Sequence, residues 1–157
     1  MTLAEELLDL AKAKGVQLAT AESCTGGMVS AAITDVAGSS AILDRGFVTY
    51  TNAAKTQMLG VSPDTLSAHG AVSEQVAREM AEGARRNSAA QIAVSITGIA
   101  GPGGSEFKPE GRVCFGITLQ TETLTETIEF GAIGRKNVRQ SARDHALRLL
   151  ISATSQV

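Results

Sequence analysis

Short apolar segments alternate along this chain with longer segments that carry apolar residues at helical spacing. Helical spacing marks residues 3–14, 28–36, the stretch that opens at 73, and roughly 134–153; short apolar runs fall at 17–21, 47–50 and 92–96. Segments of these two kinds, taken in alternation, predict an α/β layer structure. Two shorter helices are also expected, one capped by Asn52 and one with Pro63 in its first turn.

The last two predicted strands change the character of the sheet. Residues 113–119 alternate strictly between large apolar and small or polar side chains, which predicts a half-buried strand, and residues 124–130 can pair with it. The connection between them is too short for a parallel crossover, so this pair must be antiparallel. The sequence therefore predicts a mixed sheet.

Length and charge narrow the function classes. The 157 residues predict a single domain with a sizeable core. A net charge of −2 argues against a nucleic-acid surface, because phosphate backbones are bound by clustered Lys and Arg. Cys24 and Cys114 have neither metal-ligand nor disulfide spacing. With no signal peptide and no membrane span in the pattern, we expect a cytoplasmic protein that uses no metal and no cofactor.

The segment from Glu22 to Gly27, with the sequence ESCTGG, lies between an apolar run and a helical pattern. A hydroxyl or thiol placed there lies beside free N–H groups at the positive end of a helix dipole, where acyl-transfer chemistry is easily built. The simpler interpretation is that Ser23 or Thr25 caps the helix.

A serine nucleophile needs a base. His69 and His145 have no Ser or Asp pattern that supports a triad, and the Gly-x-Ser-x-Gly elbow is missing. Lys55 is the alternative, provided that burial or nearby charge keeps part of it neutral. Tyr50 is either a core residue or an orienting hydroxyl.

Thr97 to Gly104 forms a second glycine-rich segment, TGIAGPGG, directly after a predicted strand. Four glycines in seven positions let a backbone approach a ligand and form an anion nest, although a simple flexible turn remains an alternative. The segment lacks the endings of a Walker A or dinucleotide-binding loop. A small basic group at Arg135, Lys136 and Arg139 is either a phosphate site or a solvated helix face.

Taken together, the segments AESCTGG (21–27), YTNAAK (50–55) and TGIAGPGG (97–104) closely resemble the C-terminal domain of the competence/damage-inducible protein CinA. That family includes stand-alone nicotinamide-nucleotide amidases. The resemblance covers nearly the whole chain, with three motifs in the family's order. It implies a three-layer α/β/α sandwich formed by a single domain over residues 1–157.

The resemblance also implies an activity, namely hydrolysis of nicotinamide mononucleotide to nicotinic acid mononucleotide and ammonia. Ser23 would be the nucleophile, Lys55 its base and Tyr50 an accessory hydroxyl. Arg139, or as second choice Arg135, would meet the phosphate. The helix N-terminus after Ser23 would supply oxyanion donors, and Glu22 would anchor either Lys55 or a substrate hydroxyl. The residues expected to bind substrate are Glu22, Thr25, Gly26, Gly27, Thr97, Gly98, Gly101, Gly103, Gly104, Arg135 and Arg139.

Two alternatives compete with this hypothesis. Cys24 could attack in place of Ser23, since a thiol at a helix N-terminus has a lowered pKa. The chain could also be a non-catalytic nucleotide-binding or regulatory module. Its retention of both Ser23 and Lys55 favours catalysis. The resemblance further suggests a homodimer that acts on a small nucleotide, with no nucleic-acid or membrane partner.

Overall fold

The computed structural model describes residues 1–157, which build one five-stranded sheet with the order β2-β1-β3-β4-β5. The strands are β1 (Leu18–Glu22), β2 (Leu43–Val48), β3 (Ile92–Gly98), β4 (Arg112–Thr118) and β5 (Thr123–Glu129). β1 pairs in parallel with β2 and β3, whereas β4 pairs antiparallel with both β3 and β5. The predicted mixed sheet is confirmed.

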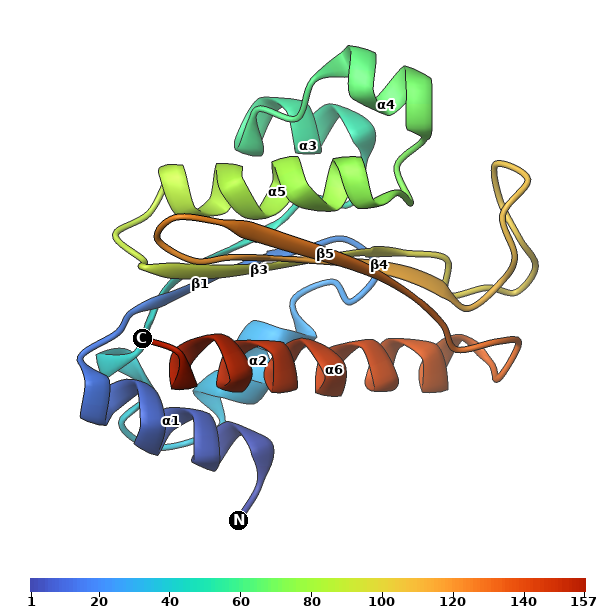
Figure 1. Ribbon diagram of the computed structural model, residues 1–157. Helices are drawn as coiled ribbons and strands as arrows, with labels where there is room; N and C mark the ends of the chain where they lie inside the picture. The colour runs from blue at the N-terminus through green and yellow to red at the C-terminus, as the bar shows by residue number, and fades with distance from the viewer.

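Helices cover both faces of this sheet (Figure 1). On one face lie α1 (Leu3–Lys14), α2 (Met28–Thr34) and α6 (Arg135–Ser155), and on the other lie α3 (Asn52–Leu59), α4 (Pro63–His69) and α5 (Glu74–Arg86). A short 3₁₀ turn (Ser39–Ala41) precedes β2. The three-layer α/β/α sandwich is thus confirmed, and none of its helices is long and apolar enough to cross a membrane.

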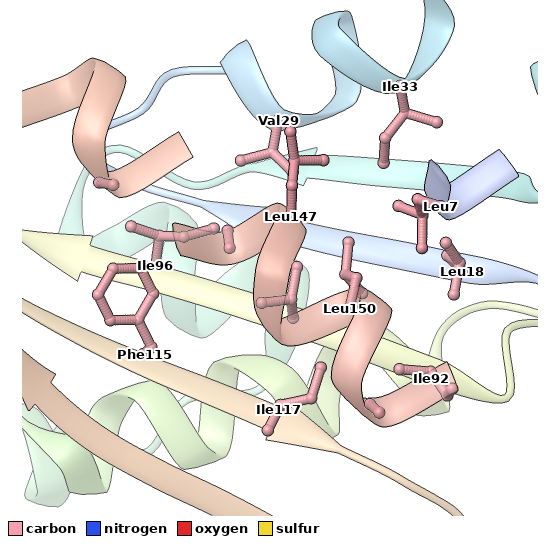
Figure 2. Packing of buried hydrophobic residues seen from close by; sticks show 14 of the residues in the cluster. Leu7, Leu18, Val29, Ile33, Ile92, Ile96, Phe115, Ile117, Leu147 and Leu150 are labelled. Atoms are coloured by element: carbon pink, nitrogen blue, oxygen red, sulfur yellow. The ribbon is translucent and has the colours of Figure 1, made fainter. Parts of the chain in front are cut away.

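The hydrophobic core is divided by the sheet. The larger part lies between the sheet and α6, and it includes Ile96 and Phe115 from the sheet and Leu150 from α6 (Figure 2). A smaller part lies under α5 and includes Val76 and Met80. Because α5 and α6 cover opposite faces of β4, that strand is buried on both sides, and its predicted half-buried state is wrong.

Three local predictions need correction. The second strand, expected at 47–50, ends at Val48, because Val48 pairs with Glu22, the last residue of β1. It begins earlier, at Leu43, and includes the charged residues Asp44 and Arg45, which an edge strand tolerates. The cap of α3 is Thr51, whose hydroxyl accepts from the Ala54 N–H, and not Asn52.

Candidate active site

Three parallel strands deliver the three sequence motifs to one edge of the sheet. β1, β2 and β3 run in the same direction, so their carboxyl ends lie side by side. Ser23 directly follows β1, Tyr50 lies two residues after β2, and Gly98 ends β3. Ligands of open α/β sheets bind outside the carboxyl ends of parallel strands. The register of the sheet therefore assembles motifs that are more than 70 residues apart in sequence.

Ser23 and Lys55 form a buried hydrogen-bonded pair at this edge. The Lys55 Nζ lies 3.1 Å from the Ser23 Oγ, and the two residues are 1% and 7% exposed. The Lys55 amine also donates to the carbonyl oxygens of Thr49, at 3.1 Å, and Tyr50, at 3.3 Å. These carbonyls aim the amine at Ser23, so the geometry is that of a nucleophile with its base.

Lys55 lies in surroundings that favour its neutral form. It forms no ion pair with a carboxylate, and its hydrogen-bond partners are one hydroxyl and two uncharged carbonyls. Burial lowers the pKa of the Lys55 amine below its ordinary value, since desolvation penalises the charged state. A neutral amine can accept the Ser23 proton, whereas a fully protonated lysine could not.

Cys24 is poorly suited to nucleophilic attack. Its side chain is buried, and burial raises the pKa of its thiol to about 12. The thiol is therefore protonated near neutral pH, and the thiolate is the reactive form. This geometry weighs against the alternative in which Cys24 attacks.

The Glu22 carboxylate holds the start of α2 and is not part of the pocket. Its oxygens accept from the N–H groups of Gly27 at 3.2 Å, Val29 at 3.0 Å and Ser30 at 3.1 Å. Glu22 makes no hydrogen bond to Lys55, so the expectation that it anchors Lys55 is wrong. The alternative expectation, that it binds a substrate hydroxyl, stays a prediction.

The same contacts change the expected source of oxyanion donors. The first N–H groups of α2 are occupied by Glu22, and the Gly26 N–H donates to the Ser23 carbonyl. The N–H groups of Cys24 and Thr25 have no hydrogen-bond acceptor elsewhere in the protein. They lie next to the Ser23 hydroxyl along the chain, so they are the candidate donors to a developing oxyanion.

A pocket of about 330 Å³ opens beside Ser23 and Lys55. The glycine-rich loop after β3 forms one wall of it, and the connection between α4 and α5 contributes Ala71 and Val72. The Thr97 hydroxyl donates to the Ala71 carbonyl at 2.8 Å, which ties these two walls together. Of the residues expected to bind substrate, Thr97, Gly98, Gly101, Gly103, Gly104 and Arg135 line the pocket.

The basic group of α6 divides between two places. Arg135 lines the pocket, where it donates to the Gly101 carbonyl at 2.7 Å and to the Tyr50 hydroxyl at 3.1 Å. Arg139 lies behind the Ser23 turn and donates to the carbonyls of Cys24 and Thr25. The structure therefore reverses the order of preference, with Arg135 as the candidate phosphate ligand and Arg139 as a brace for the turn.

Tyr50 contributes in two separate ways. Its carbonyl accepts from Lys55, while its hydroxyl, on a half-exposed side chain, accepts from Arg135. The hydroxyl makes no hydrogen bond to Ser23 or Lys55. It therefore positions the arginine at the mouth of the pocket, which differs from the accessory catalytic role that was expected.

Some predicted binding residues lie outside the pocket, and others were missed. Thr25, Gly26 and Gly27 form the turn into α2 behind Ser23 and do not line the cavity. Asn52 and Glu106 do line it. Asn52 was interpreted only as a helix cap. Glu106 lies two residues after Gly104, and no sequence motif marks that position as a binding residue.

Fold and pocket together define an α/β/α hydrolase domain with a serine–lysine pair. The chain belongs to the CinA C-terminal domain family, whose model matches residues 1–154. It is 53% identical over 152 residues to nicotinamide-nucleotide amidohydrolase PncC of Escherichia coli K12, covering 96% of this chain and 92% of that protein. PncC of Enterobacter agglomerans is 59% identical over 139 residues, 87% of this chain and 84% of that one.

Solved structures agree with this assignment. The crystal structure of the competence/damage inducible protein CihA from Agrobacterium tumefaciens has a TM-score of 0.93 and 47% identity, with coverage of 96% of this chain and 93% of that chain. A CinA superfamily protein from Escherichia coli has a TM-score of 0.89 and 36% identity, covering 96% and 89%. The fold expected from the family resemblance is confirmed.

Proposed function

We propose that this chain is a nicotinamide-nucleotide amidohydrolase, which converts nicotinamide mononucleotide to nicotinic acid mononucleotide and ammonia with Ser23 as nucleophile and Lys55 as base. The activity is that of the PncC relatives. The observation that carries the mechanism is the buried 3.1 Å contact between Lys55 and Ser23, on a pocket that also holds Arg135.

In the first half of the reaction, the neutral Lys55 amine takes the Ser23 proton as the Oγ attacks the carboxamide carbon. The N–H groups of Cys24 and Thr25 donate to the oxyanion that develops. Lys55, now protonated, gives its proton to the departing nitrogen, and ammonia leaves as the C–N bond breaks. The product of this half is an ester between Ser23 and the nicotinoyl group.

In the second half, water attacks the ester carbon and Lys55 again accepts the proton. The C–O bond to Ser23 breaks, the serine oxygen recovers a proton from Lys55, and the carboxylate product is released. Arg135 holds the phosphate through both halves, because a guanidinium offers paired donors to phosphate oxygens. Tyr50 keeps that guanidinium in place. This assignment needs neither a metal nor a cofactor.

Ammonia release from nicotinamide mononucleotide tests the proposal. We expect purified protein to release ammonia, Ser23→Ala to lose at least about 10³-fold in kcat, and Cys24→Ala to keep most of the activity. The reverse pattern between the two variants would transfer the nucleophile to Cys24. Nucleotide binding by the wild type without ammonia release would instead identify a binding module.

A cytoplasmic location and a homodimer, both suggested at the sequence level, stay predictions.

A further inference from the structure

Glu106 is the one carboxylate among the residues that line the pocket, where the basic side chains are Lys55 and Arg135. Its oxygens accept no hydrogen bond from the protein. The nearest cation is the Lys108 amine, 4.0 Å from the Glu106 Oε2, and that amine already donates to the carbonyls of His69 and Val72. The carboxylate is therefore available to a ligand.

The backbone at Glu106 is unusual. Ser105 and Lys108 exchange backbone hydrogen bonds in both directions, which closes a two-residue turn at the tip of the loop between β3 and β4 (Figure 1). Both central residues, Glu106 at φ 52° and Phe107 at φ 63°, have the left-handed conformation that usually belongs to Asn and Gly. Residues other than glycine are strained in this conformation, and such strained residues concentrate at functional sites. Phe107 is fully exposed, while Glu106 lies on the pocket.

A second segment leaves room for this carboxylate. Gly70, in the connection between α4 and α5, has a φ of 78°, and a Cβ added there would lie 2.3 Å from the Glu106 Oε2. The next two residues, Ala71 and Val72, line the pocket. The carboxylate thus lies against the wall of the pocket, in a place that two separate segments define.

The charges of the substrate can be matched to those of the pocket. Under the proposed function, the carboxamide meets Ser23 and the phosphate meets Arg135. The remaining charge of nicotinamide mononucleotide is the positive charge of its quaternary ring nitrogen. The negative charge of Glu106 raises the pKa of the Lys55 amine, against the larger effect of burial. Glu106 also lines the same pocket as Ser23 and Lys55, so its charge faces the space in which the carboxamide and its ring must lie.

We propose that Glu106 determines specificity by pairing with the cationic pyridinium ring, so that the pocket selects the oxidised nicotinamide nucleotide over the neutral 1,4-dihydro form. This inference rests on the proposed function. Opposite charge at a binding surface favours one partner over an otherwise similar one. The two forms share the carboxamide, ribose and phosphate, so they differ chiefly in the feature that Glu106 would recognise.

Binding measured in the Ser23→Ala background tests this inference, since turnover is then removed. We expect the oxidised nucleotide to bind about 10-fold more tightly than the reduced one. Glu106→Gln should abolish most of that preference, because it should weaken the binding of the oxidised nucleotide only. Glu122→Gln removes the same charge at an exposed residue outside the pocket, in the turn between β4 and β5, so it should leave the preference unchanged. Calorimetric titration gives both dissociation constants, and thermal melting verifies that each variant folds.

The remaining outcomes overturn the inference in distinguishable ways. If Glu106→Gln weakens the binding of both nucleotides equally, the carboxylate contacts the ribose or stabilises the loop and does not recognise the ring charge. No weakening of either form would remove it from recognition. If wild-type protein releases no ammonia from nicotinamide mononucleotide, the proposed function fails first and takes this inference with it.

Discussion

In the proposed mechanism Lys55 acts as the base, and its amine has no carboxylate within ion-pair distance. A buried lysine normally needs a carboxylate, since an unpaired buried charge is strongly destabilising. Here the amine has only carbonyl and hydroxyl acceptors, and at 1% exposure it has little access to water. The neutral form avoids that cost, because its two protons can go to the two carbonyls while its lone pair accepts from the Ser23 hydroxyl. The absence of a carboxylate beside the amine therefore favours the neutral form of Lys55, which is the form that can act as a base.

The pH dependence of activity follows from this lowered pKa. Ammonia release requires neutral Lys55, so kcat/KM should rise with pH and level off at a pH below the ordinary lysine pKa. Lys55→Met should lose about 10²–10⁴-fold in kcat, the usual contribution of a general base. Initial rates across pH, with buffers of matched ionic strength, measure the profile.

Stability provides an independent check on the same residue. The unfolded chain binds the Lys55 proton more tightly than the folded protein does, so stability should increase as pH rises from the folded pKa toward the ordinary value. Lys55→Met should lack this increase. An identical pH dependence of stability in both proteins would contradict the assignment of Lys55 as a base with a lowered pKa.

At the scale of elements, Glu22 joins β1 to α2 across the Ser23 turn. Its carboxylate is the last side chain of β1 and accepts three N–H groups at the start of α2. We expect Glu22→Ala to lower the free energy of unfolding by about 3 kcal/mol, because three donors lose their acceptor. Glu22→Gln, which keeps one acceptor oxygen, should lose less. Urea unfolding measures both, and unchanged stability in Glu22→Ala would show that the cap is dispensable.

Elements with strong periodicity were predictable from sequence alone. The apolar stripe of α5, from Val76 to Ala84, is buried as expected because α5 packs between the sheet on one side and α3 and α4 on the other. β2 was misplaced because an edge strand carries polar residues that no alternation marks. The hydrogen-bond partners of Glu22 were not predictable, because they depend on the geometry of the turn into α2. Those of Arg135 depend on where the start of α6 lies relative to the glycine-rich loop.

At the scale of the whole molecule, the pocket is built by the order of the strands. Segments near residues 23, 50 and 98 meet because β1 lies between β2 and β3, all parallel. The motif residues were therefore recognisable in the sequence, while their mutual distances became available only with the sheet register.

Chelation tests the chemistry of the whole molecule. No group of three His, Cys, Asp or Glu side chains is arranged to hold a metal ion, and the proposed mechanism takes both nucleophile and base from the Ser23–Lys55 pair. We expect ammonia release to be unchanged after prolonged dialysis against a chelator. Loss of activity that zinc restores would require a different mechanism.

The burial of Cys24, next to the proposed nucleophile Ser23, affects how the protein should respond to oxidants. Peroxide and alkylating agents attack thiolates, and Cys24, with its pKa raised to about 12, exposes almost none. A serine nucleophile is itself inert to these oxidants. An enzyme built this way would continue to recycle its nucleotide under conditions that inactivate amidases with a cysteine nucleophile.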